Sequence, residues 1–206
     1  MAVALTDRAE QLCDTALFFA RRGYCPATGG NFSTRVGVDS VLITASGVDK
    51  SVLTPVDLLD IGLDGKVNGD GKPSAETGLH LALYNLDATI GAILHVHSLA
   101  NTLLSRVGEP QRLTFTGYEM QKAITGQTSH AGRLTIPVFD NSQDMEQLAS
   151  WARERFDEAA PACAFLVRGH GIYAWGRDLT EAKRHLEGWE FLLDCELQRR
   201  KLEKGL

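Results

Sequence analysis

Residues 91–98, with the sequence Gly-Ala-Ile-Leu-His-Val-His-Ser, constrain the fold of this chain more than any other segment. The apolar pair Ile93-Leu94 is typical of a buried strand, in which successive side chains point to opposite faces of the sheet. His95 and His97 therefore point to the same face, with Cα atoms roughly 6.6 Å apart. Two neutral imidazoles at this spacing can bind one metal ion together. The segment predicts a buried strand that carries half of a metal site.

A histidine pair alone is weak evidence, because same-face histidines on a strand are more often hydrogen-bonded partners than ligands. A catalytic zinc usually has three protein ligands and one open position, so a third ligand is needed. His170 is the candidate, because it lies between two glycines in an expected turn that separates the strand-like runs 163–167 and 172–175. Glycines on both sides let other groups approach the turn closely. His95, His97 and His170 are therefore candidate ligands of one metal ion, whereas the remaining histidines lack a partner at ligand spacing (His80, His130 and His185).

Length and composition are those of one soluble globular domain spanning residues 1–206. The net charge of −5 and the lack of a run rich in lysine and arginine argue against nucleic acid as a partner. An anionic small molecule stays compatible with this charge, because backbone amides and a metal can create a local positive site. No apolar run reaches the roughly 18 residues of a membrane span, and the first residues do not resemble a signal peptide. The four cysteines are widely spaced and read as reduced thiols, so we expect a cytoplasmic protein without a membrane partner.

Two short segments rich in glycine and small polar residues are candidates for binding an anion. They are Thr28–Ser33 and Thr44–Gly47, which lie at the ends of the expected strands 32–36 and 41–44. Backbone N–H groups in glycine turns can form an anion-binding nest, and nearby hydroxyl and amide side chains add donors. Each segment alone is more often an ordinary turn. Together they suggest a phosphate site, although neither matches the P-loop or the dinucleotide-binding pattern.

Two glutamates are candidates for acid/base chemistry. Glu76 lies in the first turn of a helix expected over residues 74–86, where an acidic side chain usually complements the helix dipole. The alternative for Glu76 is a carboxylate that faces the metal. Glu119 follows Gly117 in a mixed polar and apolar stretch, where a solvated side chain is the ordinary interpretation. Only the metal hypothesis makes Glu119 a candidate acid/base.

Periodic apolar residues predict further helices and strands around these motifs. Helices are expected over residues 5–19, 99–107 and 145–156, and a strand over 134–139. Asp178 and Glu181 resemble a capping box that opens a long final helix through Leu197. A terminal helix this long and apolar suits either an oligomer interface or packing within the subunit.

Five short motifs in sequence order resemble the class II aldolase family, also called the aldolase/adducin family. They are Thr28–Asn31, Thr44–Gly47, Pro73–Glu76, His95–Ser98 and Gly169–Gly171. The resemblance implies an α/β fold with three α/β/α layers and a mostly antiparallel central sheet. It also implies a homotetramer with sites between subunits and zinc ligands at His95, His97 and His170. The substrate phosphate would lie near Gly30, Asn31, Thr44, Ser46 and Gly47.

Within the family, residues 117–122 and 174–176, with the end of the last helix, resemble the members that remove water from a methylthio-substituted ketose phosphate in methionine salvage. This resemblance implies a metal-dependent lyase in which Glu119 is the general acid/base. Glu76, however, matches the position where the sugar-phosphate aldolases of the family carry their catalytic glutamate. An aldolase or 4-epimerase that uses the same metal-stabilised enolate is therefore the alternative. A non-catalytic module like the adducin head is disfavoured, because all three histidines are retained.

Overall fold

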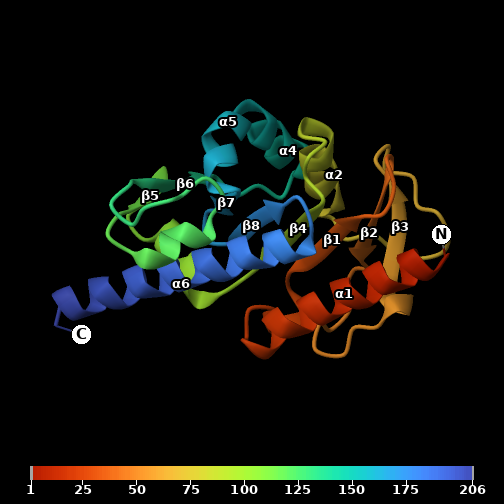
Figure 1. Cartoon of the computed structure of the whole chain (residues 1–206), viewed down its shortest axis with the longest axis horizontal. Coiled ribbons are helices and arrows are strands. Elements are labelled where there is room, and N and C mark those ends of the chain that lie inside the picture. Colours follow the sequence, from red (N-terminus) through yellow and green to blue (C-terminus); the bar gives the residue numbers. More distant parts are fainter. Residues whose placement is uncertain (1, 206) are drawn as a thin grey trace.

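In the computed structural model, which describes residues 2–205, eight strands form one sheet (Figure 1). The strands are β1 (Asn31–Arg35), β2 (Ser40–Thr44), β3 (Leu58–Gly62), β4 (Ala92–Val96), β5 (Arg112–Phe115), β6 (Leu134–Phe139), β7 (Ala164–Val167) and β8 (Gly171–Gly176). Their order across the sheet is β3-β2-β1-β4-β8-β7-β6-β5. Strands β6 and β7 run parallel, and the other neighbouring pairs run antiparallel. The mostly antiparallel sheet that we expected is confirmed.

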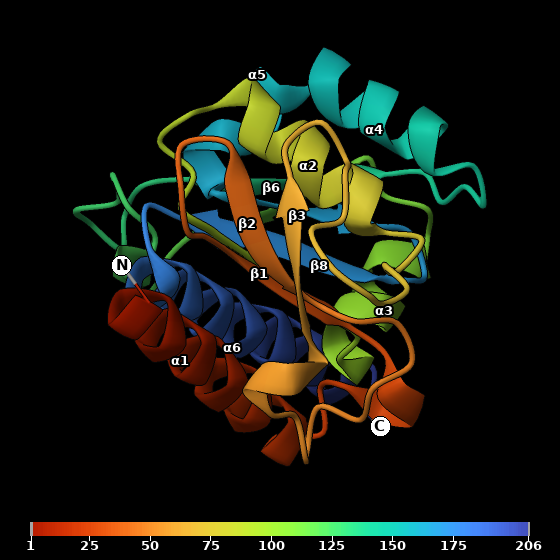
Figure 2. The ribbon, with the colours of Figure 1, turned by 90° about the vertical axis from the view of Figure 1, so that its right-hand side faces the viewer.

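Helices cover both faces of this sheet, which confirms the three-layer α/β/α architecture (Figure 2). The helices are α1 (Ala2–Arg21), α2 (Thr77–Leu86), α3 (Leu99–Arg106), α4 (Met145–Glu154), α5 (Phe156–Ala159) and α6 (Leu179–Glu203), with 3₁₀ turns η1 (Pro26–Thr28), η2 (Pro55–Asp57), η3 (Glu119–Ala123) and η4 (Ala160–Ala162). Buried residues of α1, α3 and α6 pack on one face, among them Leu12, Leu104 and Leu186. Buried residues of α2 and α4, such as Leu83 and Leu148, pack on the other face. None of the helices described within residues 2–205 combines the length and apolar character needed to cross a membrane.

Strand β4 lies in the middle of the sheet, between β1 and β8, and its alternating side chains position the histidines. Leu94 and Val96 belong to the core beneath α1 and α6, whereas Ile93 belongs to the core beneath α2 and α4. His95 follows Ile93 at a spacing of two, so its side chain lies on the α2 side of the sheet. Strand β4 ends at Val96, and His97 therefore lies just beyond the end of this central strand.

Helix α6 packs along the opposite face of the sheet from α2, as its apolar residues predict. Its start is capped by the Asp178 carboxylate, which accepts the Glu181 N–H at 2.8 Å. The Glu181 carboxylate, however, accepts the N–H of Arg177, so the reciprocal bond of a capping box goes one residue further back. Buried Leu186 and Trp189 place the first half of the helix firmly within the subunit.

Candidate metal centre

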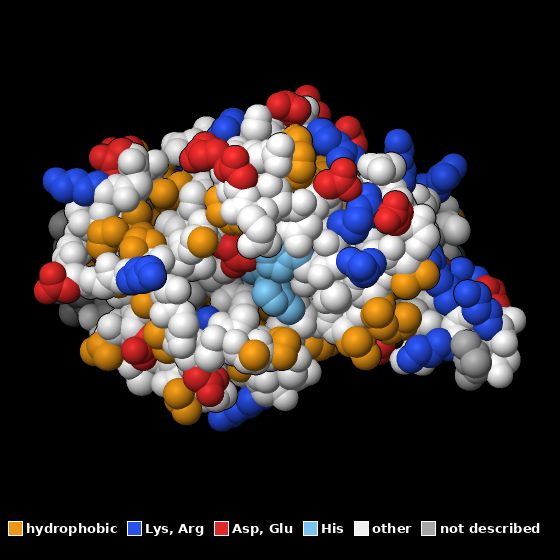
Figure 3. All heavy atoms as spheres, turned by 180° about the vertical axis from the view of Figure 1, so that it is seen from behind, with side chains coloured by type: hydrophobic (Ala, Val, Ile, Leu, Met, Phe, Trp, Pro, Cys, Tyr) orange, Lys and Arg blue, Asp and Glu red, His pale blue; other side chains and the backbone are white. Residues whose placement is uncertain are grey.

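Four side chains from three separate segments converge at the end of β4. They are His95 and His97 from β4 and the residues after it, His170 from the turn between β7 and β8, and Glu76 from the start of α2. One potential ligand atom from each of the four lies within 4.8 Å of the others. Histidine side chains are visible in a hollow of the surface in Figure 3, beside an acidic group. The structure thus brings together the three histidines singled out in the sequence and adds the carboxylate of Glu76.

The orientation of the rings suits coordination by their Nε2 atoms. His95 Nδ1 lies 2.9 Å from the carbonyl oxygen of Ile172, which can only accept, so this nitrogen carries the proton. His95 Nε2 therefore points into the cluster, 2.7 Å from His97 Nε2. His170 Nε2 lies 2.9 Å from Glu76 Oε1. A hydrogen bond that fixes the far nitrogen of a histidine is the usual support of a metal ligand.

Burial and mutual proximity set the charges of these groups. Burial, together with the neighbouring His95 and His170, lowers the pKa of His97 to about 3, so its ring is neutral at physiological pH. Burial alone would raise the pKa of Glu76, but His95 and His170 outweigh it and hold that pKa well below its usual range. Three imidazoles facing one another beside an ionised carboxylate form a donor set that fits a zinc ion or a similar divalent cation.

Glycines allow the backbone to pass close to the imidazole rings. A Cβ atom added to Gly171 would lie 2.8 Å from both His95 Cε1 and His97 Cδ2, and 2.4 Å from the carbonyl oxygen of Val96. A Cβ atom at Gly29 would lie 2.9 Å from His97 Nδ1. Neither position has room for a side chain. The glycine after His170 is therefore needed for the close approach that the sequence suggested.

The two segments predicted to bind an anion form one small cavity beside the four-residue cluster. Gly30, Asn31, Ser46 and Gly47 line this cavity of about 270 Å³, together with Glu76 and His97. Antiparallel pairing of β1 with β2 brings the two segments side by side, because one precedes β1 and the other follows β2. Thr44 lies apart from this cavity: it is fully buried, and its hydroxyl accepts the N–H of Phe32 at 3.2 Å.

The sequence pattern of the family described as class II aldolase and adducin N-terminal domain matches residues 10–197. The chain belongs to this family. Methylthioribulose-1-phosphate dehydratase of Serratia proteamaculans (strain 568) is 49% identical over 187 residues, which cover 90% of this chain and 92% of that protein. The enzyme of the same name from Enterobacter sp. (strain 638) is 45% identical over 203 residues, covering 97% of this chain and 100% of its own length. The solved structure of L-fuculose-1-phosphate aldolase from Thermus thermophilus superposes with a TM-score of 0.78, at 28% identity and with 100% of both chains covered.

One cavity residue of this class II aldolase domain was missed in the sequence. Lys50 is buried, lines the small cavity and donates from Nζ to the carbonyl oxygen of Thr28 at 2.7 Å. Burial lowers the pKa of Lys50, while nearby Glu76 partly offsets this effect. Ala27 and Thr28 have left-handed φ angles of 50° and 66°, so the lysine also ties down a turn in an unfavourable conformation. The sequence places Lys50 three residues after Gly47, but this proximity indicates a role in anion binding only once the cavity is known.

Within one chain, Glu119 lies away from the cluster of His95, His97 and His170. It opens η3, which packs against α6 on the far side of the sheet, and its side chain is 72% exposed. Its carboxylate pairs with Lys122 and lies 3.5 Å from His130 Nδ1. Of the residues described, those that line the clefts around the cluster do not include Glu119.

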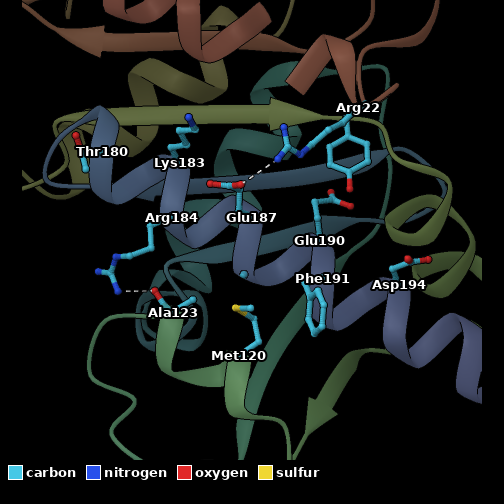
Figure 4. Close-up of a pocket in the computed structure, with 12 residues that line it drawn as sticks. Arg22, Met120, Ala123, Thr180, Lys183, Arg184, Glu187, Glu190, Phe191 and Asp194 are labelled. Atoms are coloured by element: carbon cyan, nitrogen blue, oxygen red, sulfur yellow. Dashed lines mark hydrogen bonds and ion pairs between the residues drawn. The ribbon is translucent and has the colours of Figure 1, made fainter. Parts of the chain in front are cut away.

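Two larger cavities flank these features. A cleft of about 880 Å³ opens from the cluster, with Glu76, His97 and His170 in its wall and the apolar Leu99 and Met145 at its edge. A separate groove of about 630 Å³ runs along α6 (Figure 4). Its wall carries charges of both signs, and Arg22 pairs with Glu187 across it at 3.5 Å. The groove therefore has no preference for an anion, and it is separate from the cleft that opens from the cluster.

Proposed function

We propose that the chain is a metal-dependent dehydratase that converts 5-methylthioribulose 1-phosphate to 5-methylthio-2,3-dioxopentyl phosphate and water. The observation that carries this proposal is the sequence identity of 49% and 50%, over 90% of the chain, to proteins named methylthioribulose-1-phosphate dehydratase. The cluster of three histidines and Glu76 beside a cavity rich in amide donors supports the same reaction. The reaction is one step of methionine salvage, and we expect it to take place in the cytoplasm.

His95, His97 and His170, with Glu76 beside them, would hold the zinc ion. When bound, zinc supplies Lewis acidity that polarises a ketose carbonyl and acidifies the neighbouring C–H bond. Its assignment as zinc rests on a donor set of nitrogen and carboxylate ligands.

The remaining steps belong to side chains and backbone groups of the protein. Backbone amides near Gly30, Ser46 and Gly47, with the Lys50 ammonium, bind the phosphate and orient the sugar. We assign removal of the C3 proton to Glu76, because it is the ionised carboxylate inside the cluster. Protonation of the departing C4 hydroxyl is assigned to Glu119, and the enol that remains relaxes to the diketone.

Glu119 can act in this way only if another subunit brings it to the cleft. We propose a homotetramer in which Glu119 of one subunit completes the site of its neighbour, as the family resemblance suggests. Support comes from the exposure of Glu119 and from the exposed apolar side chains of Met120 and Phe191 beside it, which suit an interface.

Mixing two inactive variants tests this arrangement. Glu119→Gln and His97→Ala subunits should each lack turnover, but refolded together they should recover about a quarter of the wild-type activity, because sites combine at random. Sedimentation should show tetramers in all three samples. Mixed tetramers without recovered activity would place both residues in the same subunit's site or remove Glu119 from the reaction.

The assay with substrate decides between the two reactions open to this fold. Purified protein loaded with zinc should produce the absorbance of the diketone from 5-methylthioribulose 1-phosphate, and a chelator should abolish it. The alternative is a sugar-phosphate aldolase or 4-epimerase, which Glu76 and the likeness to the Thermus aldolase favour. Cleavage of fuculose or ribulose phosphate without diketone would establish that alternative, and a protein without affinity for any divalent ion would point to a non-catalytic module.

A further inference from the structure

A line of five hydrogen-bonded side chains runs from the metal cluster into the core beneath α2. Three of them, Glu76, His80 and Tyr84, are spaced four residues apart and therefore lie on one face of the helix. The other two, Asn31 and Ser33, are two residues apart on β1 and point to the same face of the sheet. The helix face lies over the strand, and the side chains alternate between the two elements in the order Glu76, Asn31, His80, Ser33 and Tyr84.

The direction of every bond in this line follows from chemistry. The ionised Glu76 carboxylate can only accept, so the Asn31 amide donates an N–H to Oε2. The Asn31 oxygen then faces His80, whose Nε2 must carry the proton. His80 Nδ1 is left as an acceptor for the Ser33 hydroxyl at 2.7 Å.

The far end of the line closes in the core. Because the Ser33 proton is already used, the hydroxyl of Tyr84 donates to Ser33 Oγ at 2.9 Å. His80 and Ser33 are fully buried and Tyr84 nearly so, and burial lowers the pKa of His80 to about 3, which keeps its ring neutral. Tyr84 ends the line without reaching solvent, so the five groups do not form a proton path to the surface.

We propose that His80, acting through Asn31, is a positioning residue for Glu76. The His80 N–H fixes the Asn31 amide with its NH₂ group toward Glu76, because the opposite orientation would place the amide oxygen against the carboxylate. With Oε2 held in this way, Oε1 is directed toward His170 and His95, at 2.9 and 3.5 Å. The inference rests on the proposed function insofar as Glu76 works beside the metal.

The cost of burying these groups supports a role beyond packing. Polar side chains in a core are expensive unless all their bonds are made, and apolar residues of the same size would fill the space as well. The line is fully bonded and has one consistent direction. Such networks fix a single arrangement of the groups at their ends.

Zinc affinity, measured by chelator competition without substrate, tests the proposal. His80→Leu removes the donor and should weaken zinc binding about tenfold and lower kcat about 10- to 100-fold, with KM nearly unchanged. His80→Gln keeps an N–H near the Nε2 position and should restore most of both. Tyr84→Phe is the matched control: it should lower Tm but leave zinc affinity and kcat within about twofold, because Ser33 can still donate to His80. If the loss of zinc affinity is proportional to the loss of Tm in all three variants, the proposal is wrong and His80 is a packing residue.

The ¹⁵N chemical shifts of His80 in the metal-free protein give a second test that does not depend on the leucine variant folding. Wild type and Ser33→Ala should both show the neutral ring protonated at Nε2, because Asn31 Oδ1 still accepts that proton when the serine hydroxyl is removed. A wild-type ring protonated at Nδ1 would overturn the proposal. Both readouts are independent of the substrate, so a failed dehydratase assay with the expected zinc and NMR results would remove the proposed reaction alone.

Discussion

Glu76 is half-buried and Glu190 is buried, and their surroundings have opposite effects on the charge of the carboxyl group. Glu76 stands at the start of α2 among the histidines, and its pKa lies well below the usual range in spite of burial. Glu190 lies on α6, on the other side of the sheet, and burial raises its pKa to about 7 (Figure 4). Two carboxyl groups that a sequence cannot distinguish are thus held in different states near neutral pH.

The partners of the two carboxylates explain the difference. Glu76 has two imidazoles and the Asn31 amide around it, and the Lys50 ammonium lies close enough for its charge to be felt. Glu190 has only neutral donors, the Asn101 amide at 2.8 Å and the Ser98 hydroxyl. Burial alone therefore does not decide whether a carboxyl group is ionised. The hydrogen-bond donors and charges that replace water around it decide this. Glu76 is held ionised beside the histidines, whereas Glu190 ties α6 to the start of α3.

The largest effect should come from exchanging each carboxylate for its amide. Glu76→Gln keeps the shape but loses the charge, so we expect kcat to fall by about 10² to 10⁴ and zinc affinity to drop as well. Glu190→Gln should keep kcat within about twofold, since Glu190 lines neither the cleft nor the small cavity and the glutamine oxygen can still accept from Asn101. Steady-state kinetics at saturating zinc measure both. Equal losses in the two variants would show that the contrast between the two sites is one of stability only.

The pH dependence of the unfolding free energy tests the charge state of Glu190. Its pKa of about 7 in the folded protein exceeds the ordinary value of 4.5, so the folded state binds more protons between these values. Wild-type stability should therefore fall as pH rises from 4.5 to 7, and the stabilising effect of the proton is absent above 7. Glu190→Gln has no such proton, so from pH 4 to pH 8 it should gain roughly 3 kcal/mol in unfolding free energy relative to wild type.

Urea unfolding at the two pH values measures this gain. Glu187→Gln, at a half-exposed position of the same helix, controls for the loss of a negative charge and should show a nearly constant difference. A pH-independent difference for Glu190→Gln would mean that Glu190 is ionised in the folded protein.

Local patterns were sufficient to predict individual strands and the histidines, whereas the three layers followed from the family resemblance. The strand containing His95 was predictable because its alternation is local, and the turn at His170 because glycines flank it. Strands expected at 32–36 and 134–139 lie within one residue of β1 and β6. These features depend on residues that are neighbours in sequence, which is why a pattern could reveal them.

The hydrogen-bonded partners of Glu76, His80 and Lys50 could not be predicted because they are distant in sequence. The spacing of Glu76 and His80 was visible, but only the packing of α2 over β1 gives each of them Asn31 as a partner, 45 and 49 residues away. Lys50 reads as an ordinary surface lysine until its bond to Thr28, 22 residues earlier, is known. The site of Glu119's action stays a prediction, since it depends on a second subunit.

Lys50 gives the smallest of the expected effects and tests whether a buried cation belongs to the surroundings of Glu76. Lys50→Gln keeps a donor for the Thr28 carbonyl but removes the charge, so KM for the phosphorylated substrate should rise about tenfold with kcat within about threefold. The inhibition constant of inorganic phosphate should rise by the same factor, which separates anion binding from turnover. Lys66→Gln, at an exposed position, should leave both constants unchanged. An unchanged KM in Lys50→Gln would place the phosphate outside the small cavity and leave the lysine as a tie for the strained turn at Ala27 and Thr28.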